Sequence, residues 1–428
     1  SSKIKSSDSV HSALEGDKEF PSSFPMLRQT NLTNNKGNIM NIGIDKIGFA
    51  APDYVLDLAD LAHARNVDPN KFKIGLLQSE MAVTPVTQDI VSLGAKAAEA
   101  ILTEEDKQTI DMVIVGTESS VDQSKAAAVT IHGLLGIQPF ARSIEMKEAC
   151  YGATAGLSLA KSHISLFPES KVLVIASDIA KYGVASGGEP TQGAGAVAML
   201  VTANPRILVL NNDNVCQTRD IYDFWRPNYD KFPRVDGKFS TEQYTDCLTT
   251  TFDYYRQKTG KTLKDFAAMC LHIPFSKQGL KGLQAIAQDE ETLSRLTERF
   301  QEAIVYNKVV GNVYTGSIFL SLLSLLENSR ALEAGDQILF YSYGSGAVCE
   351  IFSGSLVEGY QNYLEENRLE QLNERTKLSV EEYEQVFFKE VSLDENGTSL
   401  DLPADQSPFA LIKVENHKRI YRKYSRMN

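Results

Sequence analysis

The sequence predicts a layered α/β fold, and two observations carry that prediction. Short apolar runs with the length of buried strands alternate with longer segments of helical period, and the alternation continues through both halves of the chain. The composition is that of a globular protein, because 43% of the 428 residues are hydrophobic and 23% are charged. We therefore expect sheets covered by helices around a large core.

The first half of the pattern begins at residue 41 with a strand of alternating character. The expected strands are 41–49, 111–115, 143–146, 171–176, 194–201 and 207–210. The expected helices are 89–102, 125–135 and 151–166. Strands followed by helices in this order are typical of βα units.

The second half repeats the same order of elements. The expected strands are 266–272, 337–341 and 347–352. The expected helices are 241–259, 277–287, 291–305 and 314–328, the last apolar on nearly every side and so expected to be buried. Asp236-Gly237 and Asn396-Gly397 are expected to form hairpin turns.

Three segments are expected along the chain. Residues 1–39 contain eight Ser and four Asn without periodicity, which predicts a disordered tail or an extension added before a native start at Met40. An N-terminal half of 40–206 and a C-terminal half of 207–428 follow, joined near 203–210. Insertions are expected at 211–240 and 375–405.

Charge and cysteine content exclude several classes of protein. A net charge of −12 is unfavourable for binding nucleic acid, and no apolar run is long enough to cross a membrane. The cysteines are too scattered for a disulfide framework and form no CxxC zinc motif, so we expect a reducing, cytoplasmic location and no metal. They are Cys150, Cys216, Cys247, Cys270 and Cys349.

Cys150 is a candidate nucleophile, because Glu148-Ala-Cys150-Tyr-Gly152 joins a predicted strand to a predicted helix of small residues. The dipole and free N–H groups of a helix N-terminus stabilise a thiolate, and the same N–H groups could hold a thioester oxyanion. A buried structural thiol is the alternative. The other four cysteines lack this setting and are interpreted as structural.

His272 and Glu118 are candidate acid–base residues, because each follows a predicted strand. A structural histidine and a helix-capping carboxylate are the alternatives. Beyond His272, Lys277 and Lys281 lie four residues apart on a predicted helix, where they could clamp phosphates or simply be solvated.

Asn312 opens the apolar helix and is expected either to cap it or to orient a histidine or a substrate carbonyl. The glycine-rich turn Ser342–Gly346 could supply N–H groups for a second oxyanion site or be an ordinary tight turn. Gly187–Gly195 is similar, but no helix is predicted after it, so it lacks a nucleotide-binding fingerprint.

Together these segments resemble one family, the hydroxymethylglutaryl-CoA synthases, and its bacterial mevalonate-pathway branch in particular. Glu148, where many animal and plant members have Asn, favours that branch. The resemblance covers residues 40–370. The segments that carry it are Gly116-Thr-Glu118, Glu148-Ala-Cys150-Tyr-Gly152, Ser177-Asp178-Ile-Ala-Lys-Tyr182, Tyr222-Asp223-Phe-Trp-Arg-Pro227, Val235-Asp236-Gly-Lys-Phe-Ser240, His272-Ile-Pro-Phe-Ser-Lys277, Gly311-Asn312-Val-Tyr-Thr-Gly-Ser317 and Ser342-Tyr-Gly-Ser345-Gly346.

The resemblance implies a thiolase-like fold of two pseudo-twofold halves in α-β-α-β-α layers, and a homodimer. It implies condensation of acetyl-CoA with acetoacetyl-CoA and water to 3-hydroxy-3-methylglutaryl-CoA and CoA, in isoprenoid synthesis. The CoA thioesters are substrates, and no cofactor is expected.

The resemblance also implies residue roles. Cys150 carries the acetyl group, Glu118 is the general acid/base, and His272, assisted by Asn312, positions the acetoacetyl group and polarises its ketone. Backbone N–H groups at Cys150 and Ser345 hold oxyanions. The remaining positions implied for substrate or CoA binding are Tyr182, Asp178, Thr191, Asp223, Lys277 and Lys281.

Three other functions remain as alternatives. A β-branching synthase of polyketide pathways would share the catalytic residues but act on carrier-protein-bound β-ketoacyl groups. A ketoacyl synthase III-type enzyme would share the fold but would not need Glu118. A non-catalytic thioester-binding or scaffold protein would not need Cys150, Glu118 and His272 together.

Overall fold

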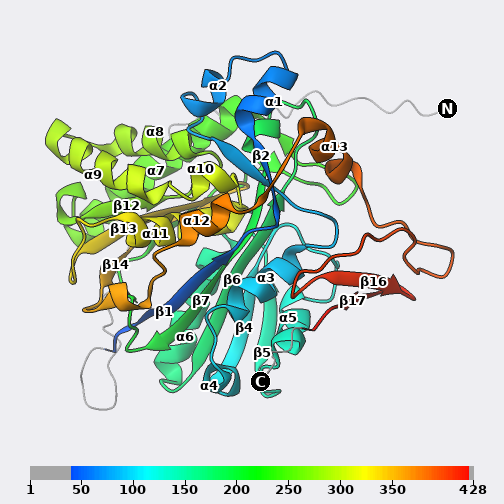
Figure 1. Cartoon of the computed structure of the whole chain (residues 1–428). Coiled ribbons are helices and arrows are strands. Elements are labelled where there is room, and N and C mark those ends of the chain that lie inside the picture. Colours follow the sequence, from blue (N-terminus) through cyan, green and yellow to red (C-terminus); the bar gives the residue numbers. More distant parts are fainter. Residues whose placement is uncertain (1–39, 424–428) are drawn as a thin grey trace, which may run out of the picture. The chain divides into compact units, whose positions relative to one another are not determined.

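The structure is a computed structural model that describes residues 40–423 (Figure 1). The predicted tail 1–39 lies outside the described residues, as do residues 424–428. Strands and helices alternate along most of the described chain, which confirms the predicted α/β class. The described residues fall within one compact unit, and the division into halves at residue 206 stays a prediction.

Ten strands form one mixed sheet, in the order β12-β13-β14-β8-β1-β7-β6-β4-β5, with β9 paired to β14. The first strand of the described chain and one from its middle meet where β1 pairs with β8. The bounds are β1 Ile42–Ala50, β4 Ile110–Gly116, β5 Arg142–Met146, β6 Lys171–Ala180, β7 Gly193–Ala203, β8 Leu208–Leu210, β9 Val215–Thr218, β12 Ala268–Leu271, β13 Gln337–Gly344 and β14 Val348–Leu356.

Three small sheets lie outside this one, and the sequence analysis predicted none of their strands. They are β15-β2-β3, the pair β10-β11 and the pair β16-β17. The bounds are β2 Tyr54–Asp57, β3 Glu80–Val83, β10 Phe224–Trp225, β11 Arg234–Val235, β15 Thr376–Leu378, β16 Leu411–Glu415 and β17 Lys418–Tyr421.

The helices cover both faces of the large sheet and fill its centre. Their bounds are α1 Leu58–Ala64, α2 Asn70–Lys73, α3 Ile90–Glu99, α4 Glu104–Thr109, α5 Ala127–Leu135, α6 Gly152–Leu166, α7 Gly237–Thr259, α8 Ser276–Ile286, α9 Glu290–Ala303, α10 Asn307–Val310, α11 Ser317–Asn328, α12 Arg368–Asn373 and α13 Val380–Phe388. All seven helices expected from the sequence are present, with ends shifted by a few residues.

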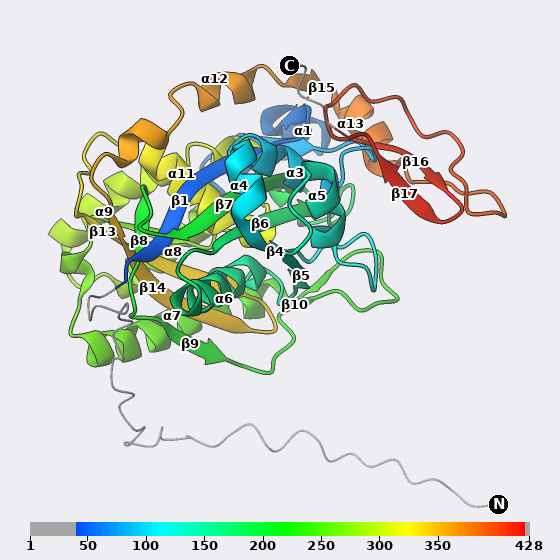
Figure 2. The same ribbon diagram turned by 90° about the horizontal axis from the view of Figure 1, so that it is seen from below.

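Alternating side chains along single strands reveal five layers. In β6, Val174 belongs to a central core shared with α6 and α11, whereas Ile175 packs under α3 and α5. In β13, Phe340 joins the same central core, whereas Tyr341 packs under α7 and α8. Because successive strand side chains point to opposite faces, the order of layers is α-β-α-β-α, as predicted (Figure 2).

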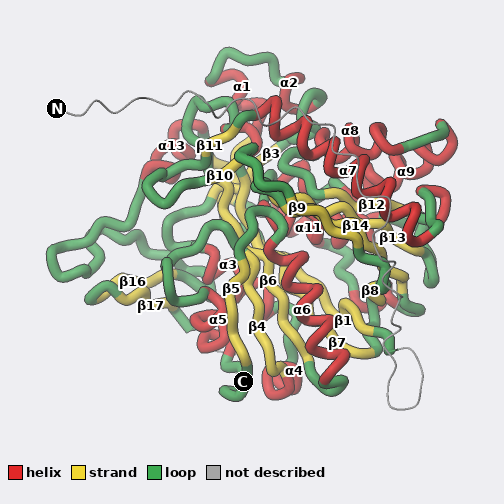
Figure 3. Tube along the Cα trace, turned by 180° about the vertical axis from the view of Figure 1, so that it is seen from behind, coloured by secondary structure: helices red, strands yellow, loops and turns green. Residues whose placement is uncertain are grey.

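The central layer explains why α11 is apolar on every side. All of its residues from Ser317 to Leu326 are buried, because strands lie on both sides of the layer. Figure 3 shows α6 lying along β4 and β6, which it contacts through small residues such as Ala153 and Ala160.

One predicted turn is wrong and another is confirmed. Asp236-Gly237 is not a hairpin: the Asp236 carboxylate accepts a hydrogen bond from Phe239 N at 3.1 Å and caps α7. An Asp before a helix and an Asp in a turn look alike in sequence. Asn396-Gly397 does form a turn, closed by the bridge between Leu393 and Ser399, with Gly397 at φ 73°.

Candidate active site

The candidate residues gather at one edge of the sheet. β4, β5 and β6 are parallel, and their carboxyl-terminal ends carry Glu118, Cys150 and Asp178. β12 and β13 are also parallel, and their ends carry His272 and Ser345. Carboxyl ends of parallel strands present side chains at a common edge, which is where ligands bind in open α/β sheets.

Cys150 lies just before α6 and is 6% exposed. Its Sγ donates a hydrogen bond to Glu118 Oε1 at 3.6 Å. The preceding Ala149 has φ 43°, a left-handed conformation that is costly for a residue with a Cβ. This sharp bend turns the chain from β5 into α6. In the first turn of α6, Ala153 N donates a hydrogen bond to the Thr315 hydroxyl oxygen at 2.9 Å.

Both members of the Cys150–Glu118 pair have pKa values above the ordinary ones. Burial, then the negative charge of Glu118, raises the pKa of the Cys150 thiol. Burial, then the charge of Asp178, raises the pKa of Glu118. Thiolate stabilisation by the helix dipole does not dominate here, because Cys150 precedes the N-cap residue Tyr151 and faces carboxylates.

Asp178 holds the segment around Glu118 through hydrogen bonds. Its Oδ1 accepts hydrogen bonds from the Thr117 hydroxyl at 2.8 Å, Glu118 N at 2.9 Å and the Ser119 hydroxyl at 2.8 Å. Burial raises the pKa of Asp178 to about 7. Glu118 does not cap a helix; its backbone is fixed by Asp178 and by Arg226, whose Nη2 donates to Glu118 O at 3.3 Å. Sequence reasoning missed Arg226 as a site residue, although it lies three residues after Asp223 in the segment Tyr222–Pro227.

His272 is 3% exposed and continues β12, with its N–H donating to Tyr341 O at 2.7 Å. The Tyr244 hydroxyl donates to His272 O at 2.7 Å. Burial lowers the pKa of His272 to about 3, so the ring is neutral near pH 7. Its buried Nδ1 has no hydrogen-bond partner within residues 40–423, which is uncommon for a buried polar atom.

Asn312 and Tyr182 form a hydrogen-bonded pair near Cys150. Asn312 Nδ2 donates to the Tyr182 hydroxyl at 3.1 Å, and Asn312 Oδ1 accepts from Tyr314 N at 2.9 Å. Cys150, Ala180 and Tyr314 pack together, with Tyr182 against them. Asn312 thus both caps the turn before α11 and binds Tyr182, which packs against the group that contains Cys150. Sequence reasoning missed Tyr314 as a site residue.

Ser345 lies in a turn that packs against the Cys150 segment. A Cβ placed on Gly344 would lie 2.6 Å from Glu148 O and 2.7 Å from Tyr151 Cβ, so only glycine permits this approach. On the other side, the buried Asp223 accepts from Gly346 N at 2.9 Å. The structure therefore brings the predicted Ser345 and Asp223 together beside the nucleophile.

Three other predicted residues make their hydrogen bonds with groups outside this cluster. Lys277 is half-buried in the first turn of α8, where its N–H donates to Leu76 O at 2.9 Å, and Lys281 is exposed one turn on. Neither lysine forms an ion pair within the described residues. The Thr191 hydroxyl donates to Gly188 O at 2.8 Å in the loop before β7.

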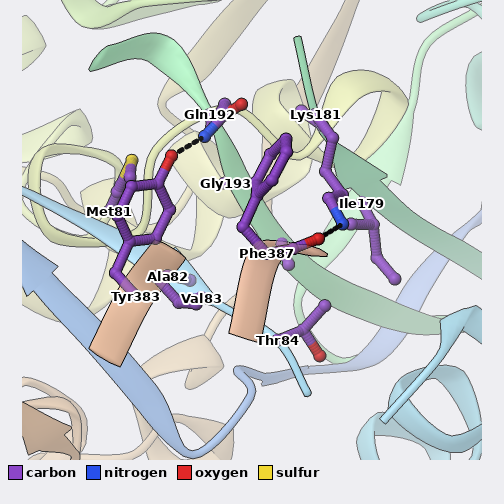
Figure 4. A pocket seen from close by; sticks show the side chains of 12 residues that line it. Met81, Ala82, Val83, Thr84, Ile179, Lys181, Gln192, Gly193, Tyr383 and Phe387 are labelled. Atoms are coloured by element: carbon purple, nitrogen blue, oxygen red, sulfur yellow. Dashed lines mark hydrogen bonds between the residues drawn. The ribbon is translucent and has the colours of Figure 1, made fainter. Parts of the chain in front are cut away.

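A small cavity lies beside the site, between β3, the β6–β7 pair and α13 (Figure 4). Ala180 lines this cavity and also packs against Cys150. Among residues 40–423, no group of three or more His, Cys, Asp or Glu side chains could hold a metal ion. None of the helices in that range is long and apolar enough to cross a membrane.

Comparison with known proteins identifies the family. The N-terminal and C-terminal models of hydroxymethylglutaryl-coenzyme A synthase match residues 38–206, and 209–295 with 281–396. The chain is 55% identical to the hydroxymethylglutaryl-CoA synthase of Enterococcus faecalis, covering 90% of this chain and 100% of that protein. It is 32% identical to the polyketide 3-hydroxy-3-methylglutaryl-ACP synthase PksG of Bacillus subtilis, covering 90% of this chain and 96% of that one.

A solved structure of an HMG-CoA synthase complexed with CoA superposes with a TM-score of 0.88 at 55% identity, covering 90% of this chain and 100% of the other. This likeness confirms the thiolase-like fold expected from the sequence. With family models over both halves and a relative matched over its whole length, the chain belongs to the hydroxymethylglutaryl-CoA synthase family.

Proposed function

We infer that this protein condenses acetyl-CoA with acetoacetyl-CoA and water to give 3-hydroxy-3-methylglutaryl-CoA and CoA. One observation carries the inference: a buried thiol before α6 donates to a partly buried carboxylate at 3.6 Å. A nucleophile in hydrogen-bond contact with a base is the arrangement that covalent acyl transfer requires. The 55% identity to the E. faecalis enzyme supports this reaction over the more distant carrier-protein chemistry of PksG.

In the first step, Cys150 Sγ attacks the thioester carbonyl of acetyl-CoA while Glu118 takes the thiol proton. The C–S bond to CoA then breaks, and Glu118 returns the proton to the CoA sulfur. One thioester replaces another, so the acetyl group stays activated. Backbone N–H groups at Cys150 and Ser345 hold the oxyanions.

In the second step, Glu118 removes a methyl proton from acetyl-Cys150, and the resulting carbon attacks the ketone of acetoacetyl-CoA. The raised pKa of Glu118 suits it to this weakly acidic proton. Neutral His272 donates a hydrogen bond to the ketone oxygen with help from Asn312, and Glu118 returns the proton that it removed to the alkoxide once the C–C bond has formed. Water then hydrolyses the enzyme thioester, which frees the product and the Cys150 thiol.

Several finer features belong to the same proposal. Lys277 and Lys281 face the CoA phosphates, and Tyr182, Asp178, Thr191 and Asp223 support substrate binding. The reaction needs no cofactor, takes place in the cytoplasm and serves the mevalonate pathway.

The proposed homodimer forms through β5. It is the last strand in the sheet order, and Phe140 just before it is 91% exposed. Edge strands of this kind are a template for pairing with another chain.

The test is the intact mass of the protein after mixing with acetyl-CoA alone, for wild type and Cys150→Ser. We expect a gain of one acetyl group, about 42 Da, on the wild type only. Acetoacetyl-CoA should then clear the label and release CoA. A label that only a carrier-bound acetoacetyl group clears would favour the β-branching synthase instead. If folded wild type gains no label, the proposal is wrong.

A further inference from the structure

Hydrogen bonds through Gln192 connect α13 to the backbone of Tyr182, whose hydroxyl binds Asn312. The Tyr383 hydroxyl accepts a hydrogen bond from Gln192 Nε2 at 2.9 Å (Figure 4). Gln192 Oε1 in turn accepts from Tyr182 N at 2.9 Å and from Gly183 N at 3.2 Å. One amide therefore fixes two consecutive backbone groups of the segment that carries Tyr182.

The far end of this chain of hydrogen bonds is anchored by a partly buried ion pair. The Tyr383 hydroxyl donates to Glu189 Oε2 at 2.9 Å. Glu189 is also bound by Arg65 through Nε to Oε1 at 2.8 Å and Nη2 to Oε2 at 3.1 Å. Arg65 Nη2 reaches Glu384 Oε1 at 2.8 Å as well, so α1, the loop before β7 and α13 are held together.

A second, independent contact joins the same loop to Asn312. A Cβ placed on Gly193 would lie 2.5 Å from Asn312 O, and one on Gly311 would lie 2.1 Å from Gln192 O. The backbone at Gln192 thus lies directly against the backbone that presents the Asn312 amide. A small rotation of the Gln192 segment would move both members of the Asn312–Tyr182 pair.

We propose that Tyr383 and Gln192 are positioning residues that set the Asn312 amide for the condensation step. Both the oxygen and the nitrogen of the Gln192 amide have hydrogen-bond partners. A glutamine amide keeps its orientation only while both its oxygen and its nitrogen are satisfied. The Tyr383 hydroxyl determines which end of the Gln192 amide faces it. Because this hydroxyl already donates to Glu189, it can only accept a hydrogen bond from Gln192, and Nε2 is the donor.

This inference rests on the proposed function, since it assigns the network to one of its two steps. Cys150, Glu118 and Asp178 make no hydrogen bond to Gln192 or Tyr383 within the described residues. Acetylation of Cys150 should therefore be insensitive to the network. Condensation, which uses Asn312, should depend on it.

The experiment compares Tyr383→Phe, which removes only the hydroxyl oxygen, with wild type in separate half-reactions. Acetylation by acetyl-CoA is followed by quenched-flow mass analysis, and discharge of acetyl-Cys150 by acetoacetyl-CoA is followed on the same sample. We expect acetylation within about twofold of wild type and discharge slower by roughly ten- to a hundredfold, the cost of a sub-ångström misplacement. Gln192→Met, which also frees two backbone donors, should slow discharge further.

Tyr306→Phe is the matched control, because Tyr306 is equally buried and donates to the carboxylate of Glu327 at 2.8 Å. It should lower the melting temperature to a similar degree while leaving both half-reactions unchanged. The ratio of the two rates on one sample does not depend on the folded fraction, so partial misfolding does not obscure the result.

Equal rate ratios for wild type and Tyr383→Phe would overturn the positioning role and leave the proposed function intact. A parallel loss of both half-reactions would also overturn it, since that is the mark of a purely structural residue. Wild-type protein that is acetylated but not discharged by acetoacetyl-CoA would overturn the proposed function itself, and this inference with it.

Discussion

Glu118→Gln should make the Cys150 thiol more acidic while abolishing condensation. The substitution keeps the shape of the side chain but removes a negative charge 3.6 Å from Sγ. By Coulomb's law that charge opposes the thiolate by about 4–5 kcal/mol at an effective dielectric constant near 20. Sharing the charge over two carboxylate oxygens reduces the effect to roughly 2–4 kcal/mol, or about 1.5 to 3 pKa units.

The direction of the change in the Cys150 pKa follows from which of the two groups, Glu118 or Cys150, ionises first. At the pH where the buried thiol titrates, Glu118 is already ionised, so its charge raises the pKa of Cys150. Removing that charge lowers the thiol pKa. The assay is the rate of alkylation by iodoacetamide from about pH 6 to about pH 11, read by intact mass, because only the thiolate reacts.

In Glu118→Gln the thiol should become more reactive toward alkylation, whereas condensation should become slower. Without a base for the methyl proton, turnover should fall by about 10²–10⁴-fold. Glu145→Gln is the control, since the Glu145 carboxylate binds Ala127 N and the Ser120 hydroxyl instead of the thiol. A thiol pKa that stays the same or rises in Glu118→Gln would show that this charge does not govern Cys150.

Three further predictions concern protonation, packing and stability. The His272 ring should stay neutral between about pH 5 and 8 in nitrogen-detected NMR, because burial lowers its pKa to about 3; a ring that titrates there would contradict this. Gly344→Ala should slow acetylation and lower the unfolding free energy by about 1–3 kcal/mol in urea titrations, because its Cβ would meet Glu148 O at 2.6 Å. Burial raises the pKa of Asp106, but hydrogen bonds with Lys46 and its other partners outweigh burial and hold this pKa below its usual range. The resulting stability exists above the unfolded pKa near 4 and is lost as pH falls. Asp106→Asn should thus be less stable at pH 7 by about 1.5–3 kcal/mol and lose less stability on acidification, as measured by thermal melts.

The parts of the fold that the sequence predicted correctly are those governed by local pattern. Residues 172–176 form a continuous apolar run and lie in a strand that is buried on both faces there. The helix after Asp89 begins where that carboxylate caps it. Elements whose stability depends on distant partners were missed, among them β2 and β15, which pair although they are separated by more than three hundred residues.

The candidate site shows the same difference between residues that local pattern indicates and residues that depend on distant contacts. Cys150, Glu118 and His272 could be singled out because each follows a strand and lies in a recognisable segment. Tyr383 and Gln192 carry no such signal, because their contact joins positions 191 residues apart and depends on how α13 docks. The raised pKa of Cys150 was also not predictable, since it depends on which carboxylates the fold places around the thiol.

The central position of β1 has a consequence for synthesis of the chain. It is the first described strand to leave the ribosome, yet its partners β7 and β8 are synthesised far later. Asp45 in β1 binds Arg206, which lies 161 residues further along the chain. At ordinary translation speeds β1 stays unpaired for roughly 8–30 s. During that interval an apolar strand with two open edges is a target for chaperones and for aggregation. Slowing elongation between β1 and β7 should therefore reduce the yield of folded enzyme more than an equal pause after β8.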